Sequence, residues 1–272
     1  MFVQRALMTL ILGPIALYLV YLGDWFFFIP LLFILLLATV EYNHMMREMK
    51  LNTSAWFITV PTAVILLTAQ FAPDASWMIP AFVFGILATL TYALWMYEKN
   101  RSETVALDWM AMMGGIVLMG ILGSHFFRLR NIDPTAGWQW MIVALVSTWS
   151  ADGGAYLVGK FMAGKLLGRH KLSPRLSPNK TVEGFGGGVL IGTGMTVLAG
   201  YLMGLPITAV FILGILISTI APLGDLSISL LKRESGVKDS GTIFGSHGGA
   251  LDRIDSLLWS VTLTFYLTVF FV

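Results

Sequence analysis

The sequence contains no cysteine and carries little charge. The absence of cysteine among its 272 residues excludes disulfide bonds and thiolate metal sites. Only 12% of the residues are charged, against about 25% in an ordinary soluble domain. The formal net charge of +2 is too small to indicate binding to nucleic acid. These shortages argue against a soluble domain and against a nucleic-acid-binding protein.

Long apolar runs take the place of the missing charge, and 57% of the residues are hydrophobic. Runs of roughly 20 residues recur along the chain, long enough to cross about 30 Å of hydrocarbon as helices. Runs this long and continuous favour helices over a membrane barrel. The sequence therefore predicts an all-α, polytopic integral membrane protein with about nine transmembrane helices. The predicted segments are 5–22, 25–41, 54–72, 77–97, 109–127, 138–160, 183–204, 207–231 and 254–272.

The lysines and arginines predict which side of the membrane each loop occupies. With a cytoplasmic N-terminus, 15 of the 17 basic residues fall on the cytoplasmic side, and only Arg128 and Arg130 fall outside. Cytoplasmic loops are enriched in basic residues. We therefore expect the N-terminus in the cytoplasm and the C-terminus outside.

Polar residues are unevenly distributed along the chain. We expect a single membrane-embedded domain over residues 1–272, in which residues 1–130 form an N-terminal transmembrane scaffold. Polar residues in that part lie mostly at the ends of the predicted segments. Residues 131–272 are predicted to form the catalytic half, with two long cytoplasmic loops that contain most of the reactive side chains.

Asp152 lies past the middle of the sixth predicted segment, close to Ser147 and Thr148. A lone aspartate at a helix centre costs about 2.5–3.5 kcal/mol to insert into a membrane. We expect it to face a polar cavity, a cation or a basic partner. The alternative is a structural hydrogen-bond hub packed on small residues.

The loop that follows is basic and ends in a predicted helix start. Ser177 suits the N-cap and Pro178 the first helical position, with Asn179, Lys180 and Thr181 next. A helix N-terminus beside a lysine attracts phosphate. A simple topology anchor is the alternative interpretation of this basic loop.

Three glycines spaced four residues apart begin the seventh predicted segment. Gly184, Gly188 and Gly192 are best interpreted as a small-residue face for helix packing. The small-residue faces of the sixth and seventh segments would also suit a homodimer.

Three aspartates flank the second charged loop. Asp225 shares a helical face with Ser229 and Lys232, while Asp252 and Asp255 share a face at the start of the ninth predicted segment. Carboxylates brought together require a cation or a proton. Oxygen ligands without cysteine suit Mg²⁺. The sequence predicts that Asp225, Asp252 and Asp255 hold Mg²⁺, with a second cation, monovalent or divalent, as an addition to that site.

The loop between these aspartates supplies cations and a glycine turn. Lys232, Arg233, Lys238 and His247 are basic, and the "GSHGG" turn is expected to leave backbone N–H groups open to an anion. Carboxylates, bases and such a turn together indicate phosphoryl or nucleotidyl transfer. The alternative interpretation is an ordinary cytoplasmic loop stabilised by salt bridges. A cation-coupled transporter would explain the intramembrane acids, although no internal repeat typical of transporters is visible.

The second loop and its flanks resemble the signature of the phosphatidate cytidylyltransferases. The pattern is Ser229-x-x-Lys232-Arg233, then Lys238-Asp239, His247-Gly248-Gly249 and Asp252-Arg253-x-Asp255. The upstream stretches "SADGGAYLVGK" and "HKLSPRLSPNKTVEGF" are also similar, so the resemblance covers residues 147–260. The first five predicted segments match only in hydropathy. Ala250 departs from the larger aliphatic residue usual in the family, which affects packing of the turn alone.

The resemblance implies a Mg²⁺-dependent enzyme of phospholipid biosynthesis that converts CTP and phosphatidic acid to CDP-diacylglycerol and pyrophosphate. Its partners would be CTP, phosphatidic acid of the cytoplasmic leaflet and membrane lipids, at a bacterial inner membrane with the active site facing the cytoplasm. A cytidylyltransferase for ether-linked or polyprenyl lipids, a CTP-dependent lipid kinase and an inactive scaffold are the alternatives. The implied catalytic residues are Asp225, Lys232, Arg233, Lys238, Asp239, His247, Asp252 and Asp255. The implied substrate-binding residues are Asp152, Ser177, Asn179, Lys180, Thr181, Gly248 and Gly249.

Overall fold

The computed structural model describes residues 2–72, 76–243, 245 and 248–271, with side chains from residue 11 onward. Its contacts divide the chain into two compact units. Unit 1 comprises Met1–Ile132 and Leu231–Ile254, and unit 2 comprises Asp133–Leu230 and Asp255–Val272. The second charged loop is therefore packed with the N-terminal part of the chain.

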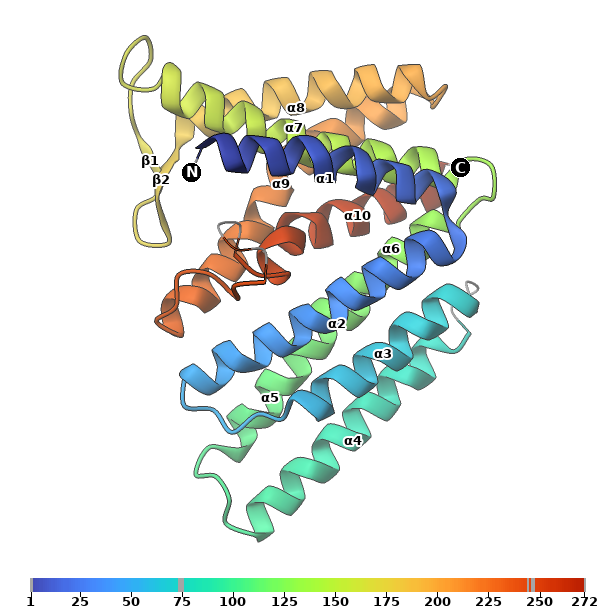
Figure 1. Ribbon diagram of the computed structural model, residues 1–272, viewed down its shortest axis with the longest axis vertical. Coiled ribbons are helices and arrows are strands. Elements are labelled where there is room, and N and C mark those ends of the chain that lie inside the picture. The colour runs from blue at the N-terminus through green and yellow to red at the C-terminus, as the bar shows by residue number, and fades with distance from the viewer. Residues whose placement is uncertain (1, 73–75, 244, 246–247, 272) are drawn as a thin grey trace. The chain divides into compact units, whose positions relative to one another are not determined.

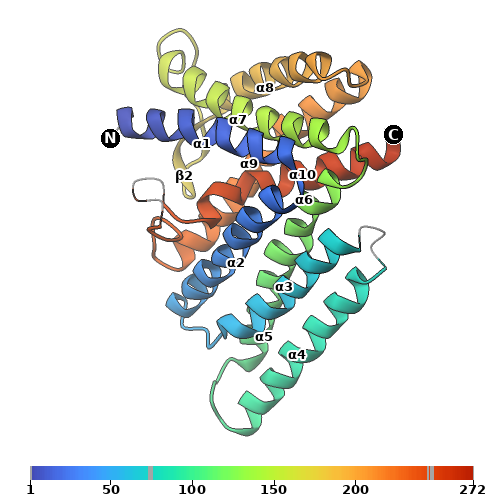
Figure 2. The same cartoon turned by 45° about the vertical axis from the view of Figure 1, so that its right-hand side comes forward.

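Unit 1 consists mainly of long helices. Figures 1 and 2 show α2, α3, α4 and α5 lying side by side. The segment predicted over 109–127 is one continuous helical run in which a π-helix, η1, joins α5 to α6. The elements are α1 (Phe2–Leu22), α2 (Asp24–Glu48), α3 (Ala55–Phe71), α4 (Met78–Glu98), α5 (Val105–Gly115), η1 (Ile116–Leu122) and α6 (Gly123–Arg130).

Large apolar side chains from α2, α3 and the α5–η1 run fill the core of unit 1. Leu35, Ile58, Ile65, Met112 and Ile116 are each 0% exposed. Burying such side chains contributes about 1.5–3 kcal/mol each when the reference is water; inside a membrane the gain comes from close packing instead. This packing gives α2 a fixed place in unit 1.

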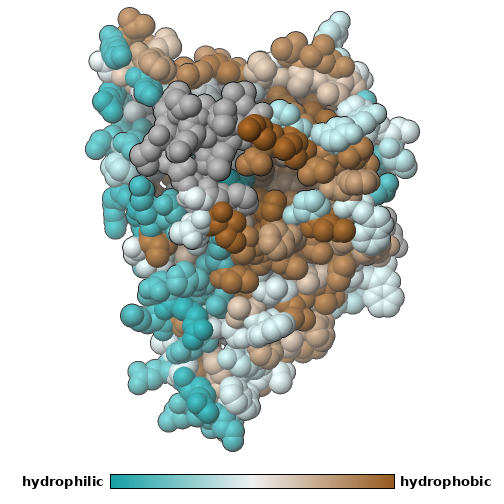
Figure 3. Space-filling view, in the orientation of Figure 1, coloured by the Kyte–Doolittle hydropathy of each residue, from teal (hydrophilic) through white to brown (hydrophobic). Residues whose placement is uncertain are grey.

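The surface of unit 1 is divided between apolar helix faces and hydrophilic loops. Apolar side chains such as Leu87 and Leu94 of α4 are more than half exposed, at 58% and 60%. Hydrophilic residues gather at the end of the unit where the loops after α2 and α4 lie (Figure 3). Lys50 and Lys99 are exposed in those loops. An apolar surface of this extent is typical of a membrane-facing protein.

Unit 2 is built on α7 (Gly137–Phe161) and α8 (Val182–Leu202), and holds most of α9 (Ile207–Glu234) and α10 (Leu251–Phe271). Gly184, Gly188 and Gly192 of α8 are buried against α7, where a Cβ on any of them would meet Ala151 or Ala155. The predicted small-residue packing face is confirmed. Because these faces pack on each other within the chain, they give no support to a homodimer.

Hydroxyl groups of α7 join it to its neighbours in unit 2. The Thr148 hydroxyl donates to Ser260 Oγ of α10 at 2.7 Å, and the Thr196 hydroxyl of α8 donates to Ser147 Oγ at 2.7 Å. Such interhelical hydrogen bonds are typical of membrane helix packing. Ser147 and Thr148 therefore serve helix association beside Asp152.

The predicted helix start at Ser177 is wrong. Residues Ser177–Thr181 form strand β2, which pairs antiparallel with β1 (Lys171–Ser173) in a small hairpin. The N-cap of α8 is Thr181, whose Oγ1 accepts the Gly184 N–H at 3.0 Å. Pro178 is tolerated in an edge strand of a two-stranded hairpin, and threonine is itself a good N-cap.

Each of the nine predicted segments overlaps a helix, and the chain is a multi-pass membrane protein. Among the described residues, seven helical segments are long and apolar enough to cross a membrane, while Ile11–Leu22 and Ala55–Phe71 are shorter apolar helices. The count of nine crossings and the orientation of the termini remain predictions. The seven are Asp24–Glu48, Met78–Glu98, Val105–Arg130, Gly137–Phe161, Val182–Leu202, Ile207–Glu234 and Leu251–Phe271.

Candidate active site

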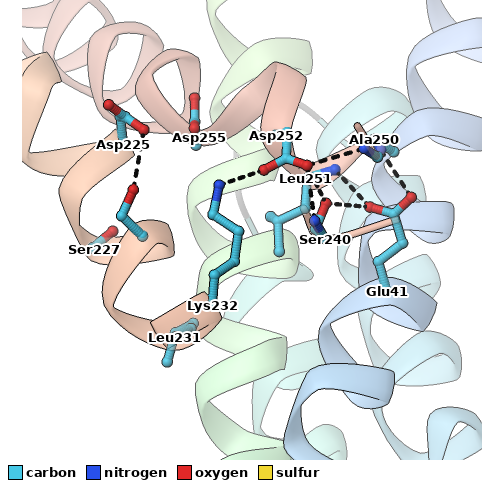
Figure 4. A network of polar contacts seen from close by, with 12 residues as sticks. Glu41, Asp225, Ser227, Leu231, Lys232, Ser240, Ala250, Leu251, Asp252 and Asp255 are labelled. Atoms are coloured by element: carbon cyan, nitrogen blue, oxygen red, sulfur yellow. Dashed lines mark hydrogen bonds and ion pairs between the residues drawn. The ribbon is translucent and has the colours of Figure 1, made fainter. Parts of the chain in front are cut away.

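Asp252, in the first turn of α10, is surrounded by hydrogen-bond donors in unit 1 (Figure 4). Its Oδ1 accepts a hydrogen bond from Lys232 Nζ at 2.6 Å. Its Oδ2 accepts hydrogen bonds from the backbone N–H groups of Ser240 at 2.8 Å and Gly249 at 3.0 Å. The Lys232 and Asp252 side chains are only 12% and 6% exposed. Charge-assisted hydrogen bonds of this kind are the stronger ones in proteins. Asp252 therefore orders the loop between α9 and α10.

A second buried carboxylate, that of Glu41 on α2, contacts the same loop (Figure 4). Glu41 is 7% exposed. Its oxygens accept the backbone N–H groups of Ala250 and Leu251, each at 2.9 Å, and lie 2.8 Å from the Ser240 hydroxyl. A residue of the predicted scaffold thus reaches the segment that carries the family-like signature.

The sequence contains evidence for a role of Glu41, but the predicted bounds of the second segment obscured it. The second predicted segment ended at residue 41, so Glu41 looked like a polar end residue. The helix instead continues to Glu48, which places Glu41 two turns inside it. An acid within an apolar helix marks a site with a partner, and that rule applied to α2 would have found it.

The other predicted residues of this loop have more open surroundings. Arg233, Lys238 and Asp239 are exposed in unit 1. His247 lies outside the described residues. The charged groups are therefore accessible to a ligand from water, as expected for residues that bind phosphates.

The glycine turn has a different structural role from the predicted one. The Gly249 N–H donates to Asp252 and the Gly248 N–H to the Gly245 carbonyl at 3.3 Å, so both amides have protein acceptors. A Cβ at Gly249 would collide with both carboxylate oxygens of Glu41. Glycine at 249 thus makes room for the Glu41 carboxylate.

In unit 2, Asp225 of α9 forms an ion pair with Lys180 of β2. Asp152 of α7 is exposed and lies within electrostatic range of both groups. The Ser229 hydroxyl is 3.5 Å from Asp225 Oδ1. The structure therefore brings together two predicted acids from separate helices, and Lys180 is the basic partner of Asp225, as intramembrane acids require.

The remaining predicted residues of the hairpin lie beside Lys180. Asn179 is exposed and Ser177 half-buried in β2, while Thr181 is buried as the N-cap of α8. Glu183, in the first turn of α8, accepts the His170 N–H at 3.1 Å and so ties the start of β1 to α8. The hairpin thereby holds Lys180 in place on unit 2.

Gly224 permits a close crossing of α9 and α10 in unit 2. A Cβ at this position would lie 2.5 Å from the Asp255 carbonyl oxygen, 2.5 Å from Trp259 Cδ1 and 3.1 Å from Ser256 Cα. Gly224 is therefore a packing position of α9. The crossing brings the backbone of Asp225 next to that of Asp255.

Replacing Gly224 with alanine is expected to lower the free energy of unfolding by about 1–3 kcal/mol, because the new Cβ overpacks the crossing. Thermal unfolding of the purified protein in detergent measures this loss. The control is Gly194→Ala on α8, where a Cβ would have no neighbour within 4 Å. Equal melting temperatures for the two variants would contradict this description of the crossing.

Metal binding by these carboxylates stays a prediction. Within residues 2–72, 76–243, 245 and 248–271, no three His, Cys, Asp or Glu side chains come together as a metal-binding group. The backbone of Asp255 lies against Gly224, the neighbour of Asp225, at the α9–α10 crossing. Mg²⁺ is often held by one or two carboxylates, with substrate phosphates and waters completing its shell. The oxygen donors of Asp225 and Asp255 fit that chemistry.

Comparison with known proteins places the whole chain in one family. The family model of the cytidylyltransferases matches residues 3–271. The phosphatidate cytidylyltransferase of Bacillus subtilis (strain 168) is 33% identical over 280 residues, covering 98% of this chain and 98% of that protein. The phosphatidate cytidylyltransferase of Synechocystis sp. (strain ATCC 27184 / PCC 6803 / Kazusa) is 32% identical over 297 residues, covering 98% and 96%.

These matches extend the resemblance beyond the signature loop. They include residues 3–146, where the sequence alone showed only similar hydropathy, and so include Glu41 as well as the hairpin and the loop. The chain belongs to the cytidylyltransferase family and is a nucleotidyltransferase.

Proposed function

We propose that the chain transfers CMP from CTP to phosphatidic acid, giving CDP-diacylglycerol and pyrophosphate in phospholipid biosynthesis. The observation that carries this proposal is the family match over residues 3–271, together with full-length relatives named phosphatidate cytidylyltransferase. The same match favours an enzyme over a cation-coupled transporter.

The chemistry requires no nucleophile from the protein. A phosphate oxygen of phosphatidate attacks the α-phosphorus of CTP in line, the bond from that phosphorus to the bridging oxygen breaks, and pyrophosphate leaves. The attacking phosphate is already ionised at neutral pH, so no strong general base is needed. Catalysis then consists of positioning and of neutralising charge on the phosphates.

Basic side chains of the two loops neutralise the substrate phosphates in this proposal. Lys238 of the loop and Arg233 in the last turn of α9 are exposed and bind the triphosphate from water. Lys180 of the hairpin is half-buried beside Asp225 and binds phosphate there. Lys232 is occupied by Asp252, and therefore acts by fixing the loop as well as by its charge.

Asp225 and Asp255 are the residues proposed to hold Mg²⁺, with Asp152 as a supporting acid. A bound Mg²⁺ would offset charge on the phosphates of CTP and orient them. Both oxygens of Asp252, which the sequence grouped with these two, accept hydrogen bonds from Lys232 and two backbone N–H groups, and its side chain is only 6% exposed. The Asp225 side chain is 30% exposed and has one ion pair, with Lys180. We therefore assign Asp252 to loop order, and this assignment revises the predicted set of metal ligands.

The proposed location is the cytoplasmic side of a bacterial inner membrane. CTP is found in the cytoplasm, and the two loops rich in lysine and arginine are cytoplasmic in the predicted topology. Phosphatidate would come from the cytoplasmic leaflet, so its headgroup and CTP would reach the charged loops from the same side.

The test is product formation by the purified chain in detergent with CTP and phosphatidate. We expect CDP-diacylglycerol and pyrophosphate in equal amounts, loss of both after chelation of divalent cations, and recovery with Mg²⁺. Ether-linked phosphatidate and polyprenyl phosphate in separate reactions test the alternative lipids. Folded protein that forms no product with phosphatidate would overturn the proposal, and full activity under chelation would overturn its metal dependence.

A further inference from the structure

The loop between α9 and α10 is held by a carboxylate from the opposite end of the sequence. Glu41 lies on α2, and it bonds to Ser240, Ala250 and Leu251 across about 200 residues of chain, with sequence separations of 199, 209 and 210. All four residues belong to unit 1. Apolar packing fixes α2 in this unit, so Glu41 is a rigid anchor for the loop.

The N-terminus of α10 explains why the anchor is an acid. The first N–H groups of a helix have no acceptor within the helix, and the helix dipole favours negative charge there. Glu41 gives one oxygen to the Ala250 N–H and the other to the Leu251 N–H. The carboxylate thus caps α10 from another helix and sets where its first turn, including Asp252, begins.

Ser240 connects the two buried carboxylates. Its hydroxyl lies 2.8 Å from Glu41 Oε2 and 3.0 Å from Asp252 Oδ2. Since it has one proton, it donates to one carboxylate at a time, while its backbone N–H donates to Asp252 at 2.8 Å. A continuous chain of bonds therefore runs from Glu41 through Ser240 and Asp252 to Lys232.

We propose that Glu41 is a positioning residue for nucleotidyl transfer, acting through Ser240 and Asp252 on Lys232 at the end of α9 and on the loop that carries Lys238. The inference rests on the proposed function, in which these lysines meet the triphosphate. Glu41 touches no substrate in this proposal. Loss of its charge releases the start of α10 and moves the lysines away from the CTP phosphates, so CTP binding and kcat suffer while phosphatidate binding does not.

The variant Glu41→Gln tests this directly because it preserves shape. Each Glu41 oxygen accepts a backbone N–H, so either orientation of the glutamine amide sets an NH₂ group against one of these donors. We expect kcat/KM for CTP to fall at least tenfold, with a raised KM for CTP and an unchanged KM for phosphatidate. A simple loss of folded protein lowers the apparent kcat and leaves both KM values unchanged.

Asp108→Asn is the matched control in unit 1. Asp108, in the first turn of α5, is buried like Glu41, and it accepts the Asn52 N–H at 2.8 Å and the Ser102 hydroxyl. These donors belong to the loops after α2 and α4, away from the loop between α9 and α10. We expect near wild-type kinetics for its folded fraction. A Glu41→Gln protein with wild-type kcat/KM for CTP, or one whose losses match the control at unchanged KM, would overturn the inference.

Two further measurements separate this inference from the proposed function. Hydrogen–deuterium exchange over residues 248–254 should rise in Glu41→Gln and not in Asp108→Asn, whichever substrate the enzyme uses. Ser240→Ala, a smaller change, should raise the KM for CTP in the same direction even if Glu41→Gln does not fold. Wild-type protein inactive with phosphatidate would overturn the proposed function, while unchanged exchange in Glu41→Gln would overturn the positioning role.

Discussion

Asp225→Asn is expected to lower kcat about 10²- to 10³-fold, the effect of losing a charge that stabilises the reacting phosphates. The change removes the carboxylate that pairs with Lys180 and that we propose as a Mg²⁺ ligand. Titration of activity with Mg²⁺ should give a half-saturating concentration well above that of the wild type. After chelation, a Mg²⁺ concentration that fully restores the wild type should restore only part of the variant's own maximal rate.

Two variants show whether this loss comes from the metal or from the ion pair. Lys180→Met removes the pair and keeps the carboxylate, so it should change the KM for a substrate and leave the Mg²⁺ requirement near wild type. Asp133→Asn, on the loop before α7, is the control. The Asp133 carboxylate accepts the backbone N–H groups of Thr135 and Ala136 in its own turn, so its loss should leave the Mg²⁺ requirement unchanged. The metal assignment of Asp225 is contradicted if Lys180→Met and Asp225→Asn shift the Mg²⁺ requirement equally.

Asp252→Asn is expected to lower kcat about 100-fold by another route. An asparagine NH₂ group faces either the Lys232 ammonium or the N–H groups of Ser240 and Gly249, and the buried lysine loses its counter-charge. Breaking one partner of a buried ion pair costs about 3 kcal/mol or more. The melting temperature should fall together with activity, and exchange of the 235–243 backbone should rise.

The Mg²⁺ titration distinguishes the two aspartates. For Asp252→Asn we expect an unchanged half-saturating Mg²⁺ concentration at a reduced maximal rate, because Asp252 orders the loop. A shift in Mg²⁺ requirement as large as that of Asp225→Asn would return Asp252 to the set of metal ligands that the sequence predicted.

Local rules predicted the helical part of the fold well. Hydrophobic length marked all nine segments that the structure shows as helices, and the four-residue spacing of Gly184, Gly188 and Gly192 identified the face of α8 that packs on α7. Both features depend on residues close in sequence. The hairpin of β1 and β2 was missed because Ser177-Pro178 is a common helix start, and the pairing of Lys171 with Thr181 was decided by contacts beyond that short stretch.

The sequence predicted which residues form the site better than it predicted which residues they contact. The signature loop pointed to the acids and bases, and the structure joins Asp225 to Lys180 and Asp252 to Lys232. No local pattern links Glu41 to Ala250, because the two are 209 residues apart. Such contacts depend on how α2 and the loop pack within unit 1. Hydropathy and motif spacing carry no information about that packing.

The most direct test of CMP transfer uses CTP labelled at either the α- or the γ-phosphate, with phosphatidate and Mg²⁺. The account predicts that the α-label enters the lipid fraction and the γ-label leaves as pyrophosphate. Recovery of the γ-label in the lipid, with CDP left in water, would show a CTP-dependent lipid kinase and contradict the account.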